Sequence, residues 1–105
     1  MIQVLVAYGP KADKDSPFKN NDDFIKAFEP ESKQKQFAEM LLKGSIPTEG
    51  YKINVERVGL SSAGGLKALQ YAAKVEMPGG YLSHETTMVA FHRDRIVKVT
   101  INYLY

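Results

Sequence analysis

The sequence predicts a single α+β domain spanning residues 1–105, a two-layer sandwich in which two to three helices pack on one face of a mixed four-stranded sheet. Three observations predict this class. The expected elements follow the order β-α-α-β-α-β-β, at least two strands have one polar face, and the helices are amphipathic. A chain of 105 residues that is 44% hydrophobic can bury about two-thirds of its surface around one core.

The chain begins with an apolar segment. Apolar side chains fall on both faces of Ile2–Tyr8, a pattern typical of a central strand that is covered on both sides. Gly9 and Pro10 end this strand. The polar segment Lys11–Asn21 is expected to form a long loop, with Phe18 anchoring it to the core.

Two helices are expected next. Asn21 or Asp22 is expected to cap a short helix, and Pro30 to lie in the first turn of a second helix. The second helix is expected to run to about Lys43, with Gly44 as its C-terminal cap. Their apolar stripes consist of Phe24, Ile25, Phe28, Phe37, Met40 and Leu41.

The second half of the chain mixes strand and helix patterns. Tyr51–Val58 alternates strictly at its start, which predicts a strand with one solvated face. Leu66–Val75 follows a segment rich in serine and glycine and is expected to be the third helix. The last two strands, Thr87–Phe91 and Val97–Tyr105, flank the polar turn His92–Arg95 and predict a β-hairpin.

The composition excludes several classes of function. The chain has no cysteine, which excludes disulfides, thiolate metal sites and thiol nucleophiles. Its 14 Lys and Arg against 12 Asp and Glu give a net charge of +2, too small to indicate nucleic-acid binding by itself. No signal peptide is recognisable, and no apolar run reaches the roughly 18 residues of a membrane span. We therefore expect a soluble, cytoplasmic protein with no cofactor and no membrane partner.

The first candidate site is a serine- and glycine-rich segment before the predicted third helix. Backbone N–H groups at a helix start can hold an anion, and nearby hydroxyl and ammonium groups would strengthen such a site. Its members are Ser61, Ser62, Gly64, Gly65 and Lys67. The spacing matches neither the P-loop nor the dinucleotide-binding fingerprint, and the alternative is that a serine caps the helix.

The second candidate is the surface of the terminal hairpin, where cations are interleaved with aromatic residues. Such a surface can bind a partner, or stack bases and contact phosphates. Its members are His92, Arg93, Arg95, Lys98, Tyr103 and Tyr105. The alternation works against nucleic acid, because it places the apolar side chains from Val97 to Tyr103 on one face, expected in the core, and Lys98 on the other.

The sequence predicts no metal ligands and no catalytic residues. The two histidines, His84 and His92, are eight residues apart, which on one strand is about 26 Å and too far to share a metal. The acidic loop that begins at Asp13 fails the EF-hand pattern, since its sixth position is Phe18 instead of glycine.

These features favour an interaction or regulatory protein without enzymatic activity. We expect it to bind a protein partner, or a second copy of itself, through a sheet edge or through the tyrosine-rich C-terminal strand. One alternative is a small-ligand-binding or enzymatic domain of the dimeric α+β-barrel type, with an anion site at Ser61–Gly65 or a pocket reached by Tyr8 and His92. A second alternative is nucleic-acid binding through the Arg93–Lys98 hairpin.

Overall fold

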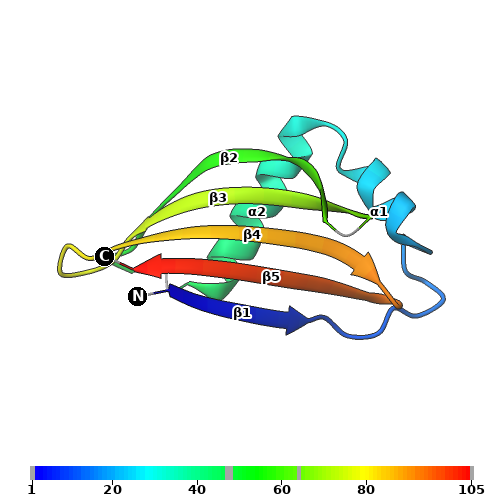
Figure 1. Ribbon diagram of the computed structural model, residues 1–105, viewed down its shortest axis with the longest axis horizontal. Helices are drawn as coiled ribbons and strands as arrows, with labels where there is room; N and C mark the ends of the chain where they lie inside the picture. Colours follow the sequence, from blue (N-terminus) through cyan, green and yellow to red (C-terminus); the bar gives the residue numbers. More distant parts are fainter. Residues whose placement is uncertain (1, 47–48, 64, 105) are drawn as a thin grey trace.

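The computed structural model describes residues 2–46, 49–63 and 65–104, which form one sheet with two helices on one side of it (Figure 1). The elements are β1 (Ile2–Tyr8), α1 (Asn21–Ala27), α2 (Glu31–Ser45), β2 (Lys52–Ala63), β3 (Leu66–Glu76), β4 (Leu82–His92) and β5 (Arg95–Leu104). The start of β1 and the end of β5 lie side by side, because Ile2 pairs with Tyr103.

The sheet has five strands in the order β1-β5-β4-β3-β2, and every strand pair is antiparallel. The predicted mixed four-stranded sheet is therefore wrong. Strands β2 to β5 form a meander in which each strand pairs with the next. The long connection through α1 and α2 carries the chain from β1 at one edge to β2 at the other.

The predicted third helix is strand β3, which accounts for the additional strand. Leucine and alanine favour a helix locally, but the side chains of this segment also alternate. The residues that point to the core are nearly fully buried: Leu69, Tyr71, Ala73 and Val75. Pairing with β2 on one side and β4 on the other satisfies the backbone, and this tertiary context outweighs the local preference for a helix.

The two helices are held by polar side chains at their ends. Asn20 is the N-cap of α1, where its side-chain oxygen accepts a hydrogen bond from the N–H of Asp23 at 2.9 Å. Gln34 of α2 is buried, and its Nε2 donates to the carbonyls of Phe28 and Glu29 at 2.7 and 3.2 Å. These bonds fix the second helix against the end of the first.

Asn21, one of the two predicted caps, links α1 to the sheet instead. Its Nδ2 donates to the carbonyl of Lys67 at 2.9 Å, and its Oδ1 accepts from the N–H of Phe91 at 3.0 Å. The pairing of β3 with β4 ends at Leu69 and Val89. The Asn21 side chain therefore bridges the two strands just beyond the point where their own ladder stops.

The core lies between the helices and one side of β2, β3 and β4. We call this the helix side of the sheet and the opposite side the open face. Aromatic rings fill the space under α1, with ring centroids 5.0 Å apart for Phe24 and Phe28 and 4.6 Å apart for Phe28 and Phe37. The ring of Phe18 lies 5.3 Å from that of Phe24, so Phe18 anchors the polar loop to the core, as predicted.

A β-bulge in β2 adjusts its side-chain pattern to this core. The register with β3 shifts between Val55 and Arg57, which leaves Glu56 as an extra residue. Val55 before the bulge and Val58 after it then pack against the same core, which a strict two-residue period would forbid.

Candidate interaction surface

Strand β1 forms one edge of the sheet, where it pairs with β5 and leaves its other side open. All seven of its residues are exposed, although Ile2–Tyr8 contains no charged residue and no proline. The prediction of a central strand covered on both sides is therefore wrong. An apolar edge without such protection is unusual, because its free backbone groups and apolar side chains favour contact with another chain.

The open face of β1 and β5 is a continuous apolar surface. The register sets Val4 opposite Ile101 and Val6 opposite Val99, and paired residues share one side of a sheet. The members of this surface, which we call the β1–β5 apolar face, are Ile2, Val4, Val6, Tyr8, Val97, Val99, Ile101 and Tyr103. The six that are most exposed keep between 43% and 68% of their surface in solvent, and none of the eight residues is charged.

Strands β4 and β5 carry polar side chains on the helix side of the sheet. Thr87 of β4 and Thr100 of β5 are buried, and their hydroxyl oxygens lie 3.0 Å apart in a hydrogen bond. Burial raises the pKa of Tyr71, whose hydroxyl also bonds to Thr87. Burial likewise raises the pKa of Glu85, while the positive charge of Lys98 acts in the opposite direction.

The predicted orientation of β5 is thus inverted. The alternation is as predicted, but the side chains from Val97 to Tyr103 lie on the open face, while Thr100 points to the helix side. Lys98 shares the side of Thr100, two residues away. Because the buried hydroxyls bond to one another, the helix side tolerates them without the cost of an unpaired polar group.

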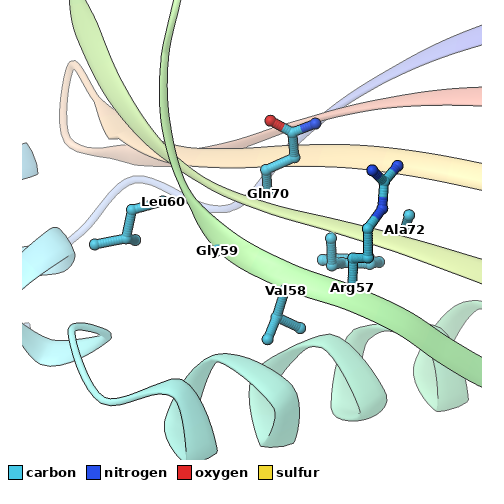
Figure 2. A pocket seen from close by; sticks show the side chains of 7 residues that line it. Arg57, Val58, Gly59, Leu60, Gln70 and Ala72 are labelled. Carbon is cyan, nitrogen blue, oxygen red and sulfur yellow. The ribbon is translucent and has the colours of Figure 1, made fainter.

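Strands β2 and β3 have the polarity that a two-layer fold requires. Arg57 and Gln70 point away from the helices, and Val58 points toward the helix below it (Figure 2). A hollow of about 160 Å³ lies beside Gly59 between these strands. The open face therefore changes character across the sheet, from polar at β2 and β3 to apolar at β5 and β1.

The register confirms the predicted hairpin of β4 and β5. A second hollow lies at the tip of this hairpin. It has a volume of about 500 Å³ and is lined by Tyr8, His92, Arg93, Arg95 and Val97. Arg93 and Asp94 form the two-residue turn of the hairpin. Their φ angles are positive, at 51° and 64°, a conformation that favours Gly and Asn over other residues. The Arg95 guanidinium donates to the carbonyl of Gly9 at 3.2 Å, which ties the tip to the end of β1.

The structure brings together part of the predicted hairpin surface. His92, Arg93 and Arg95 line one hollow, and Tyr8 of β1 joins them as one of its walls. Lys98 lies on the opposite side of the sheet, and Tyr103 lies near the other end of β5, where it pairs with Ile2. Tyr105 lies outside the described residues.

The predicted anion site loses the helix on which it was based. Ser61 and Ser62 belong to β2, and Lys67 belongs to β3, where it pairs with Ser62. Ala63 pairs with Leu66, so two residues connect the strands, and Gly65 has a φ of +83°. Gly64 lies outside the described residues. Anion binding at this hairpin remains a prediction without the aligned N–H groups of a helix start.

The described residues show no group of three or more His, Asp or Glu side chains that could hold a metal ion. His84 and His92 lie near opposite ends of β4. The Nδ1 of His84 is 3.8 Å from Oε1 of Glu56, a contact between two half-exposed side chains that is worth little in stability.

No protein-family model matches the chain, and no curated protein is similar to it in sequence. Neither of the helices in the described residues has the length and apolar character to cross a membrane.

Sequence reasoning missed the apolar residues of β1 as surface residues. The signal that could have found them is present, because a strand that is apolar on both faces needs cover on both faces. The described residues form two helices, and both pack on the core of β2, β3 and β4. A comparison of the number of helices with the number of apolar strand faces would have shown that one strand has no helix to cover it.

Proposed function

We propose that this protein is a small interaction protein that binds another polypeptide through the β1–β5 apolar face and the adjoining β1 edge. The observation that carries the proposal is the combination of an unprotected edge strand with an uncharged, exposed apolar face. Large contiguous apolar patches on soluble domains mark interaction sites, and the centres of interfaces are depleted in charge and enriched in tyrosine.

Site-specific photo-crosslinking in cells that produce the protein tests this proposal. A benzophenone amino acid is placed at Val4 on the apolar face, and the matched control carries it at Lys33, an exposed residue of α2. We expect a crosslinked polypeptide from position 4 and none from position 33. Equal products from both positions, or none from position 4, would contradict the proposal.

A second candidate function is nucleic-acid binding at the tip hollow. The observation that favours it is the presence of Tyr8 beside Arg93 and Arg95, because an exposed ring can stack a base while cations contact phosphates. The site differs from the predicted one, since Lys98 lies on the other side of the sheet.

Fluorescence anisotropy with a single-stranded oligonucleotide tests this second candidate. Binding should weaken steeply between about 50 and 200 mM salt, on the order of tenfold or more for a few phosphate contacts. The double variant Arg93→Gln, Arg95→Gln should abolish the binding, and Lys98→Gln should leave it unchanged. Equal losses from the double variant and from Lys98→Gln would refute a site at the tip.

A further inference from the structure

The open face of the sheet is apolar at β1 and β5, where the described residues place no covering layer over it. In β2 and β3, by contrast, the large apolar side chains of Val58 and Leu69 face the helices, and Arg57 and Gln70 face away from them. In β5 the buried Thr100 faces the helix side, whereas Ile101 faces solvent. Apolar side chains are less favourable in water than under an apolar layer, so a cover over the open face of β1 and β5 would stabilise the molecule.

The molecule also has more surface than a compact monomer of its size. Its accessible surface is 7,017 Å², while a monomeric protein of 11.7 kDa is expected to have about 5,900 Å². The radius of gyration is 14.2 Å, against about 13 Å for a compact chain of this length. This excess of roughly 1,100 Å² belongs to the whole molecule, and it is large enough to include the ~800 Å² that each partner contributes to a stable interface of standard size.

The chemistry of the apolar face matches a second copy of itself. The face contains no charged group that would require an opposite charge on the partner, and its two tyrosines lie at opposite ends, with Tyr8 paired to Val97 and Tyr103 to Ile2. Charges gather beyond the end that carries Tyr8, at Arg93 and Arg95. An uncharged apolar centre with a polar rim is the arrangement of homodimer interfaces, and a twofold axis lets each copy use the same surface.

We propose that a second copy of this chain covers the β1–β5 apolar face, sheet against sheet, in a twofold homodimer. The proposal rests on the proposed function and names its partner. Packed sheets lie about 10 Å apart with their apolar side chains interdigitated, so face-to-face packing buries both apolar faces at once. Pairing through the β1 edges would instead place the two apolar faces side by side and leave both exposed.

Light scattering coupled to size-exclusion chromatography tests the dimer with two variants of β5. Ile101 and Leu104 lie on opposite faces of this strand and are similarly exposed, at 47% and 40%. We expect wild type at about 100 μM to have twice the 11.7 kDa mass of one chain. Ile101→Lys should weaken the dimer at least about 100-fold and give monomer, and Leu104→Lys should remain dimeric. Circular dichroism confirms that both variants fold, which their exposed positions favour.

Each other outcome of this experiment overturns the proposal. A wild type that is monomeric at about 100 μM has no such dimer, and a dimer that survives Ile101→Lys does not use this face. Dissociation by both variants would show a contact that is not specific to the open face.

A single cysteine separates face packing from edge pairing, because the chain contains no other cysteine. Strand β5 lies inside the β1 edge, so edge pairing would leave its open face in solvent, whereas face packing would bury it. Single cysteines introduced in turn at Val99 and Ile101 should therefore react slowly with iodoacetamide in the dimer, and Leu104→Cys should react fast. Fast alkylation of a dimeric protein at both open-face positions would overturn face packing.

The photo-crosslink at position 4 distinguishes failure of this inference from failure of the proposed function. A monomeric protein that still crosslinks to a polypeptide of another mass refutes the homodimer and keeps the interaction surface. A monomeric protein without any crosslink refutes both.

Discussion

The two edge strands of the sheet, β2 and β1, differ in how they are protected against contact with other chains. The β2 edge contains charged Lys52 and Arg57, a bulge at Glu56, and α2 packed beside it. The β1 edge has none of these features, and its seven residues alternate without interruption against β5. Charges and bulges are the devices by which sheets prevent contact with other sheets. This chain therefore protects one edge of its sheet with its own residues and leaves the other edge unprotected.

The largest expected effect comes from comparing one aliphatic residue in each half of the sheet. Leu69 of β3 is fully buried, while Ile101 of β5 is 47% exposed. Leu69→Ala should lower the free energy of unfolding by about 2–5 kcal/mol, because it leaves a cavity among close-packed neighbours. Ile101→Ala should cost less than about 1 kcal/mol in dilute protein.

Urea denaturation at micromolar concentration measures both changes. Val75→Ala serves as a control for the β3 core, since it removes a smaller buried side chain from the same strand. If Ile101→Ala were as costly as Leu69→Ala at low concentration, the open face would already be a packed core within one chain.

The fold was predictable where local pattern and tertiary context agree. The hairpin at His92–Arg95 and the anchoring of Phe18 follow from alternation and from an isolated aromatic residue in a polar loop. The segment Leu66–Val75 was not, because leucine and alanine suit a helix and the pairing with two neighbouring strands is not visible locally. The Gly64-Gly65 pair was the available signal for a hairpin there.

The candidate surface was predictable in alternation but not in orientation. A two-residue period says which residues share a face, and it cannot say which face meets the helices. Thr100 and Val99 could each have been the inward residue. Thr100 faces inward because its hydroxyl forms a hydrogen bond with the hydroxyl of Thr87 on the neighbouring strand β4. Such a cross-strand partner becomes visible only when the register is known.

A second prediction tests the buried polar side of the β5 half. Thr100→Val keeps the shape of the side chain and removes the hydroxyl that bonds to Thr87. We expect a loss of about 1–2 kcal/mol in the free energy of unfolding, since a buried hydroxyl loses a partner. Thermal or urea denaturation measures it, with Thr86→Val as a less buried threonine control on the open face of β4. A gain in stability from Thr100→Val would show that the helix side prefers an apolar residue there.

A third prediction concerns the turn that joins the two strands. Arg93 and Asp94 both have positive φ, and a type I′ turn favours Asn-Gly at these positions. The double variant Arg93→Asn, Asp94→Gly should raise the free energy of unfolding by about 1 kcal/mol. Chemical denaturation checks the sign, and the backbone hydrogen bond from Ala12 to the carbonyl of residue 94 should persist in amide exchange. Unchanged stability would mean that the arginine contributes contacts that offset its strained backbone.

The smallest expected effect is a pH dependence from Glu85, a partly buried carboxyl group on the helix side of β4. Burial raises its pKa above the usual value of 4.5, so the folded protein binds a proton that the unfolded chain releases. Its contribution to stability is therefore fully present below pH 4.5 and is lost as the pH rises through the raised pKa of the folded state. The substitution Glu85→Gln removes this titration, and the variant should be at least as stable as wild type near neutral pH. Urea denaturation of both proteins from acidic to neutral pH should show that the stability of the variant relative to wild type increases as the pH rises. The opposite slope would mean that Lys98 outweighs the burial of Glu85 and holds the carboxylate in its charged form.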